Sequence, residues 1–191
     1  MTSSRTWTAL ALTALALTGC SYSVNGTPLP GAGSAPPSAP ATSSADAPPK
    51  IGRQRSVAGV DPCSLLTAGD LADIGPPKKE PARKDDVIPE SCQYVLDDGT
   101  PAGRTVVTAL YQKYEQVRAR QAKGSEEVLE GHSAWVLCDL SGNEMACTVT
   151  IAVNANRSVL VAMTQPGGAA ERMLAVMRPL VRSALNRLPP A

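Results

Sequence analysis

The sequence predicts a single α+β domain with a mainly antiparallel sheet of about five to six strands, packed by two to three helices. Three observations support this fold class. Runs that alternate apolar and polar residues are joined by links of hairpin length, which favours antiparallel pairing. Amphipathic stretches at helical spacing occur between and after these runs, and they need a sheet face to cover. The 191 residues include only 3% aromatic residues and no Phe, so we expect an aliphatic core.

Capping residues predict two short helices at the start of the domain. Asp61 before Pro62 fits an N-cap followed by the first helical position. Thr67 begins the second short helix, with Asp70 in the capping-box position and Gly75 as its stop.

Strands dominate the remainder, with one helix between them and one after them. Residues 78–90 carry mixed charges and two prolines, which predicts a solvated loop; a recognition loop is the alternative. The next elements are a helix over 111–123 and strands over 92–96, 104–110, 127–130, 135–140, 145–153 and 158–164. The chain then enters a long amphipathic helix from Ala169, which Pro179 kinks or splits in two.

The first part of the chain is predicted to be an export signal followed by a linker. Residues 1–19 carry one charge, Arg5, before an apolar run that is too short for a permanent membrane span. Residues 20–58 are rich in Ser, Ala, Pro, Gly and Thr, and we expect them to be disordered because they bury too little apolar surface. Residues 59–191 remain as the one domain, long enough to bury a single core.

Cys20 follows the apolar run directly, after Thr18 and Gly19. This arrangement resembles the bacterial lipobox, in which the cysteine thiol receives a diacylglycerol and becomes the new N-terminus. Two or more acyl chains, palmitate among them, form a lasting anchor, whereas a single chain binds a membrane reversibly. The resemblance implies a lipoprotein held at the extracytoplasmic face of the cell membrane. The alternative is an ordinary secretory signal with a chance cysteine.

Four cysteines lie within the predicted domain, and an even number in an exported protein implies two disulfides. A hairpin that turns at Gly142 places Cys138 opposite Cys147. That pairing leaves Cys63 to bridge Cys92. The competing interpretation is a metal site or a redox pair, but the chain has no CxxC and only one His. We therefore expect no metal and no cofactor.

The sequence contains no recognisable catalytic constellation, because the GxSxG, HExxH, GxGxxG and phosphate-loop motifs are all absent. We expect His132, the only imidazole, to be a surface or strand-edge residue rather than a general base. Paired acids in turns fit poorly with two acids that face one cleft. Such pairs occur at Asp85-Asp86, Asp97-Asp98 and Glu126-Glu127.

Trp135, Met163, Met173 and Met177 are candidates to line an apolar groove between the last helix and the sheet. Methionine-rich patches suit adaptable ligands, because the side chain is flexible and polarizable. Core packing is the alternative interpretation of these four residues.

The motif Asp61-Pro62-Cys63-Ser64-Leu65-Leu66-Thr67, after a lipobox and a Pro/Ser/Ala linker, resembles the DPC-x-LL(T/S) domain start of a known family. This is a domain-of-unknown-function family of small actinobacterial secreted lipoproteins. Ser91-Cys92-Gln93-Tyr94 is similar to the family's C-x-(W/Y/F) strand, and Gly131-His132-Ser133-Ala134 to its Gly-x-x-Ala segment. The resemblance implies a surface lipoprotein with a fold akin to PsbP/Mog1-like sheets. It implies no catalytic residues, because the family has no assigned chemistry.

These observations predict a non-enzymatic, membrane-anchored module that binds or assists a cell-envelope protein or a small apolar ligand. Two alternatives stay open: a cell-wall or lipid-processing enzyme with an unrecognised site, and a structural accessory subunit of a membrane complex. Without Arg5 the chain carries 17 basic and 17 acidic residues. Because this balance gives no broad attraction to polyanions, we expect no nucleic-acid partner.

Overall fold

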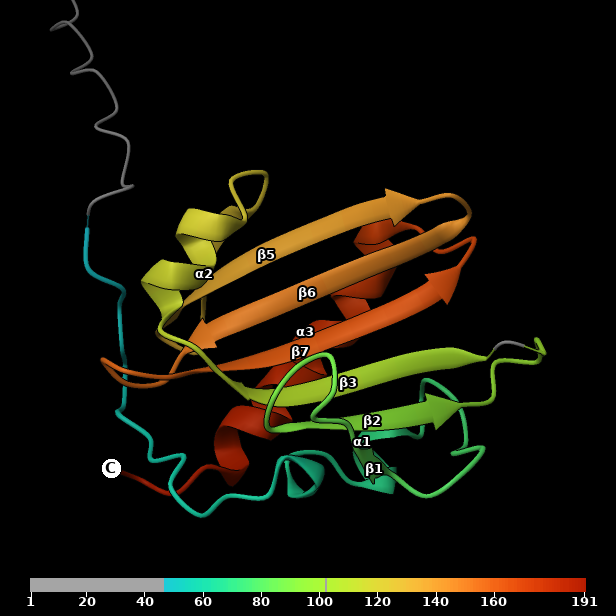
Figure 1. The fold of residues 1–191 in the computed structure, drawn as a ribbon, viewed down its shortest axis with the longest axis horizontal. Helices are drawn as coiled ribbons and strands as arrows, with labels where there is room; N and C mark the ends of the chain where they lie inside the picture. The colour runs from blue at the N-terminus through green and yellow to red at the C-terminus, as the bar shows by residue number, and fades with distance from the viewer. Residues whose placement is uncertain (1–46, 102) are drawn as a thin grey trace, which may run out of the picture. The chain divides into compact units, whose positions relative to one another are not determined.

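Alternating apolar and polar residues build a seven-stranded sheet in the order β1-β2-β3-β7-β6-β5-β4 (Figure 1). The computed structural model describes residues 47–101 and 103–191. All neighbouring strands pair antiparallel. The strands are β1 (Ala82–Arg83), β2 (Ser91–Leu96), β3 (Arg104–Tyr111), β4 (Ser125–Leu129), β5 (His132–Ser141), β6 (Glu144–Ala152) and β7 (Ser158–Pro166). The helices are the 3₁₀ turn η2 (Pro62–Ser64), α1 (Ala68–Leu71), α2 (Tyr114–Arg120) and α3 (Ala170–Arg187).

The α+β class and the antiparallel sheet are confirmed, but the expected five to six strands are too few. The additional strand is β1, which lies inside the segment predicted to be a solvated loop. Ala82 pairs with Gln93 and Arg83 with Cys92, and the Lys84 N–H donates to the Ser91 carbonyl at 3.0 Å. Edge pairing of so short a strand depends on tertiary contacts, so local sequence does not reveal it.

Two helix boundaries differ from the prediction. Strand β3 continues through Tyr111, which pairs with Ser158, so α2 begins only at Tyr114. Helix α3 is one helix of 18 residues with Pro179 inside it, rather than two pieces. Pro179 is exposed and lacks the backbone N–H that would continue the helical hydrogen bonds. Six buried side chains of α3 pack against the core, and this packing stabilises the helix more than the missing hydrogen bond destabilises it.

The two predicted caps are present. The Asp61 carboxylate accepts from the Cys63 N–H at 3.1 Å, and Thr67 and Asp70 form a capping box. Asp70 also meets Arg187 of α3 at 2.8 Å. Although partial burial raises the pKa of Asp70, hydrogen bonds from Thr67, Ser183 and Arg187 lower it from 3.8 to about 2. This carboxylate therefore ties α1 to α3.

Both disulfides are present as the sequence predicted. Cys138 lies opposite Cys147 in the β5–β6 hairpin, and the two are bonded. The register depends on a two-residue turn in which Gly142 has φ +60°, a conformation that favours glycine. Cys63 is bonded to Cys92, which joins η2 to β2.

The core lies between one face of the sheet and a cover formed by α3, α1 and η2. In Figure 1, α3 lies behind the sheet, and it contacts β6 and β7 most extensively. We call this side of the sheet the helix face. The largest fully buried side chains of the core include Tyr94, Leu65, Leu71, Leu96, Ile151, Met163, Met173, Met177, Leu180 and Leu188.

Residues 50–56, which we name the strap, belong to the folded unit rather than to the linker. The Lys50 carbonyl accepts from the Ser133 N–H at 2.8 Å, the Arg55 N–H donates to Val153 at 2.9 Å, and the Ser56 N–H donates to Pro189 at 2.9 Å. The folded unit thus begins before residue 59 because these backbone groups find partners in distant elements.

The predicted signal, Cys20 and most of the linker lie outside the described residues. None of the helices in the described part of the chain combines the length and apolar character needed to cross a bilayer.

Candidate binding groove on the open face of the sheet

The second face of the sheet has no helix over most of its area, and we name it the open face. Antiparallel register places its side chains in rows that cross five strands. One row is Gln93, Val107, Ala162, Thr148 and Leu137, and the next is Val95, Thr105, Thr164, Ala146 and Asp139. Of these only Asp139 is charged, and all are partly or fully exposed.

Helix α2 covers only the end of this face. There Ala109 and Thr150 are fully buried and Leu160 is 2% exposed. The Trp135 indole Nε1–H donates to the Gln121 carbonyl at 3.1 Å, which attaches the end of α2 to β5. Burial raises the pKa of Tyr114, the first residue of α2, with the nearby Glu126 carboxylate adding to the shift. The next two rows have no such cover.

A groove of about 440 Å³ lies on this uncovered part. Its floor consists of Gln93, Thr105, Val107 and Thr164, from three adjacent strands. The loop that precedes β2 forms a wall, and in Figure 1 this loop curves in front of β3. The remaining lining residues are Lys84, Asp86, Val87, Ile88, Ser91 and Glu144.

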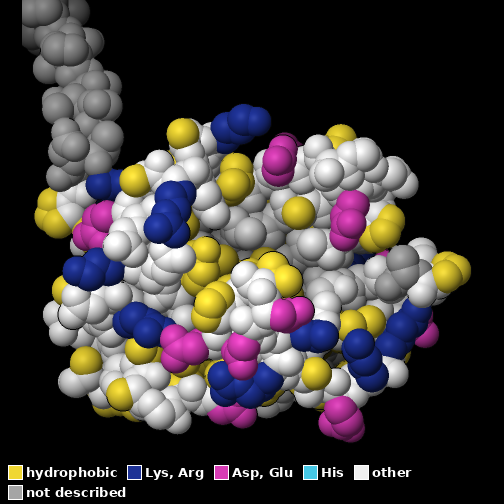
Figure 2. All heavy atoms as spheres, in the orientation of Figure 1, with side chains coloured by type: hydrophobic (Ala, Val, Ile, Leu, Met, Phe, Trp, Pro, Cys, Tyr) yellow, Lys and Arg dark blue, Asp and Glu magenta, His cyan; other side chains and the backbone are white. Residues whose placement is uncertain are grey.

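The groove combines apolar side chains with uncharged hydrogen-bonding groups. Val107, Ile88 and Val87 offer apolar contact, and Val87 is 83% exposed. The threonine hydroxyls and the Gln93 amide offer hydrogen bonds without charge. Figure 2 shows hydrophobic and uncharged side chains across the middle of this face, with charged side chains in its lower half and around its margin. The groove therefore suits a ligand with an apolar body and few charges.

The wall of the groove is fixed at both ends of the loop. The Lys84 carbonyl accepts from the Ser91 hydroxyl. At the other end, the Glu90 carbonyl accepts from the Leu110 N–H at 3.1 Å. The Glu90 carboxylate pairs with Arg157. A preformed wall reduces the ordering cost of binding.

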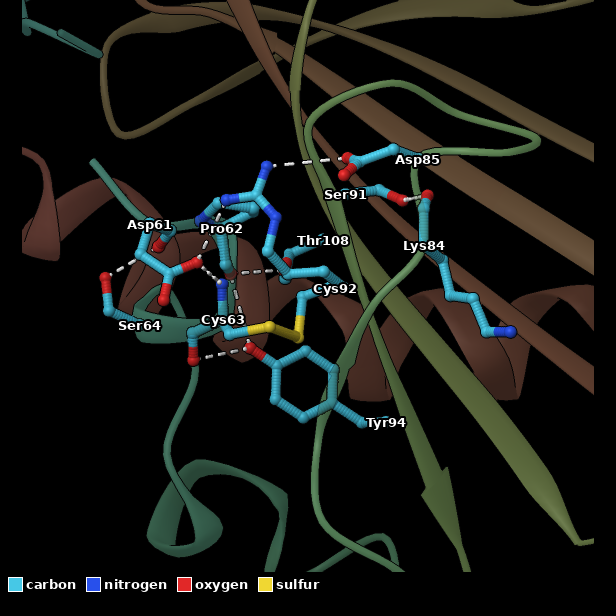
Figure 3. Close-up of a disulfide and its surroundings, with 11 residues drawn as sticks. Asp61, Pro62, Cys63, Ser64, Lys84, Asp85, Ser91, Cys92, Tyr94 and Thr108 are labelled. Carbon is cyan, nitrogen blue, oxygen red and sulfur yellow. Dashed lines mark hydrogen bonds and ion pairs between the residues drawn. A yellow bond between two sulfur atoms is a disulfide. The ribbon is translucent and has the colours of Figure 1, made fainter. Parts of the chain in front are cut away.

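The Cys63–Cys92 disulfide fixes β2 from the opposite face (Figure 3). The Tyr94 hydroxyl donates to the Cys63 carbonyl at 3.1 Å, and the Thr108 hydroxyl donates to Pro62 at 2.8 Å. Burial raises the pKa of Tyr94, which keeps this hydroxyl a donor. Because β2 and β3 are held here, the floor of the groove on their other side is rigid.

The predicted groove of Trp135 and three methionines does not form. Met163, Met173 and Met177 are at most 2% exposed in the core between sheet and α3. Trp135 alternates with the core residues Ala134 and Val136 along β5, so it points to the open face. Met163 and Met173 line a separate pocket of about 270 Å³ near the start of α3, without Trp135 or Met177.

His132 is 2% exposed, so it is not a surface residue; it is the first residue of β5. Its Nδ1 lies 2.7 Å from the Ala152 carbonyl. Helical cover and the strap bury it, and neither contact is visible in local sequence.

The paired acids take part in separate local contacts. Asp85 pairs with Arg83, and Asp97 with Lys78, while Asp98 accepts from Thr100 within a turn. Glu126 pairs with Arg118 and Glu127 with Arg178. Within residues 47–101 and 103–191, no group of three or more His, Cys, Asp or Glu side chains is placed to hold a metal ion.

Sequence reasoning missed the floor of the groove, although a signal was present. A solvent-facing set of strand positions is normally polar and often charged. Here Gln93, Val107 and Thr164 share one face with no charged residue among them. Val106-Val107 places an apolar side chain on both faces of β3.

Comparison with known proteins gives a family but no characterised relative. No curated protein and no solved structure matches the chain significantly. The family described as protein of unknown function, DUF3558, matches residues 15–177, and the chain belongs to this family.

Proposed function

We propose that this protein is a membrane-anchored extracytoplasmic lipoprotein that binds a small apolar ligand on the open face. The main support for this proposal is the groove of about 440 Å³ with a largely uncharged floor. Ligand pockets commonly have volumes of roughly 300–1,000 Å³ and apolar walls with a few polar groups. A molecule with a long acyl chain and a small polar end fits this chemistry.

The size of the groove favours a small ligand over a large partner. The two uncovered rows of the open face, which cross five strands and include the groove, cover roughly 350 Å², from a strand spacing of about 4.8 Å and a repeat of about 7 Å. A stable protein interface needs about 800 Å² on each side. A protein partner would have to extend its contacts well beyond this groove.

The anchor is supported by the segment around Cys20. The family match begins at residue 15 and so includes the Leu17–Cys20 motif. Acylation there would place the groove close to a source of acyl-chain molecules.

The anchor is tested in cells grown with a labelled fatty acid. Cys20→Ala should carry no label and should leave the membrane fraction, because no thiol remains to be acylated. Ser21→Ala is the matched control and should remain labelled and membrane-bound. Label on the Cys20→Ala chain, or its unchanged retention in the membrane, would reject the lipoprotein assignment.

The groove is tested with the Cys20→Ala chain and a fluorescent fatty acid. Val107→Trp and Thr164→Trp should each fill the floor and weaken binding about tenfold or more. Val128→Trp is the matched control, because Val128 is 53% exposed on β4 outside the groove. Absence of saturable binding, or equal weakening by the control, would reject the small apolar ligand and favour an accessory role toward a protein.

We also propose kinship with PsbP/Mog1-like folds. An antiparallel sheet with one long helix across a face supports this proposal. Superposition of an experimental structure on members of that class would test it.

A further inference from the structure

His132 connects the strap to the sheet through both of its ring nitrogens. Nδ1 lies 2.7 Å from the Ala152 carbonyl oxygen. On the other side of the ring, Nε2 lies 3.4 Å from the Arg53 amide nitrogen. The side chain is 2% exposed, so water has little access to replace either partner.

These two contacts define the protonation state of the ring. A carbonyl oxygen only accepts, so the proton of the neutral ring sits on Nδ1. Nε2 then offers a lone pair, which the Arg53 N–H uses as its acceptor. The neutral imidazole is therefore the form that holds the strap.

We propose that His132 is a pH-dependent latch for the strap. A proton taken from solvent at Nε2 turns this acceptor into a second donor. The Arg53 N–H then faces an N–H and loses its partner. The strap detaches locally around Arg53, while the bonds of Lys50 and Arg55 hold its two ends.

The acids on the neighbouring strand and turn already have partners of their own. Glu130 pairs with Arg182 at 2.6 Å, and Glu127 with Arg178 at 3.0 Å. Glu126 accepts from the Ser133 hydroxyl at 2.7 Å and pairs with Arg118 at 3.7 Å. The strap itself carries Lys50, Arg53 and Arg55, and the β6–β7 turn carries Arg157, which pairs with Glu90. Protonation therefore removes the acceptor at Nε2 without giving the ring an ionic partner among these groups.

The strap lies at the start of the folded unit, so the latch would control how closely this segment is seated on the sheet. Gly52 shows how closely the strap is seated, because a Cβ there would lie 3.1 Å from the Gly131 carbonyl oxygen. Ser133 stays covered during local release, because its hydroxyl accepts from the Lys50 N–H at 2.9 Å at the end of the strap that remains bonded.

The test is a pH titration of the full-length chain by NMR over roughly pH 5 to 8, where histidine side chains ordinarily change charge. His132 is the only histidine, so its ring signal is unambiguous. We expect the ring and the Arg53 amide to share one midpoint, with hydrogen-exchange protection at Arg53 reduced about tenfold or more below it, after correction for intrinsic exchange.

Two variants separate a latch from a merely structural residue. His132→Gln keeps an uncharged acceptor and donor, so protection at Arg53 should be independent of pH over this range. Gly52→Ala should loosen the strap at every pH, because its Cβ crowds Gly131. A ring that titrates without a change at Arg53, a ring that does not titrate, or the same pH dependence in His132→Gln would each overturn the proposal.

Discussion

The two faces of the sheet are built from the same strands but differ in cover and in composition. On the helix face, Val106, Val161 and Met163 are at most 1% exposed beneath α3 and its neighbours. On the open face, Val107, Ala162 and Thr164 alternate with them and stay partly exposed. The difference teaches that one face supplies the core, whereas most of the other stays open to solvent.

The cover of the helix face is also cross-linked by a disulfide and an ion pair. On the open face, α2 is held at one end of the sheet by the Trp135–Gln121 hydrogen bond and the Arg118–Glu126 ion pair, without a disulfide among the described residues. The Cys63–Cys92 bridge ties η2 to β2, and Arg187 ties α3 to Asp70 of α1. We therefore expect stability to depend mainly on the helix face.

The largest expected effect is loss of the Cys63–Cys92 bridge. Cys63→Ala/Cys92→Ala should lower the free energy of unfolding by about 3–4 kcal/mol, because the bridge closes a long loop. Cys138→Ala/Cys147→Ala is the matched comparison and should cost less than 3 kcal/mol, since these residues are only 9 apart in sequence. Urea unfolding measures both. A larger loss from removing the Cys138–Cys147 bridge would contradict the view that the Cys63–Cys92 bridge stabilises the helices on the helix face.

The next effect compares two adjacent valines of β3. Val106→Ala should cost about 2–3 kcal/mol, because it removes two buried methyl groups and leaves a cavity. Val107→Ala should cost less than about 1 kcal/mol, because solvent already reaches this side chain. Equal losses in urea unfolding would mean that the open face is as well covered as the helix face.

The smallest expected effect concerns Asp70 and pH. Its pKa in the folded chain is about 2, below the ordinary 3.8, so its stabilising contribution is present above pH 4 and is lost as pH falls from about 4 to about 2. We expect about 1 kcal/mol, since solvent screens this site. Thermal unfolding of Asp70→Asn against the parent chain should show a difference that disappears toward pH 2. A stability difference that stays constant across that range would show that the ionised Asp70 carboxylate does not cause it.

Local signals predicted most of the secondary structure and both disulfides. Asp61, Thr67 and Gly142 act within a few residues of themselves, through caps and a turn, so their effects can be inferred from neighbouring positions. Strand β1 and the strap depend on partners far along the chain. Their pairing was invisible because neither has a distinctive local pattern.

The groove on the open face was not predicted from the sequence. An apolar groove was expected, yet Met173 and Met177 pack into the core while Val107 and Thr105 line the actual groove. Periodicity indicates that a residue belongs to a face, but it does not indicate which face receives a helix. The burial of His132 was missed for the same reason.

The sequence alone determined the alternation of the strands, the hairpin register at Gly142 and the cysteine pairing that follows from it, because these depend on short-range geometry. Only the tertiary structure decided that α3 covers one face and leaves the other largely bare, and that the strap reaches His132. These arrangements depend on which distant elements pack on the apolar surface of the sheet, and the residues next to one another in sequence do not indicate this packing.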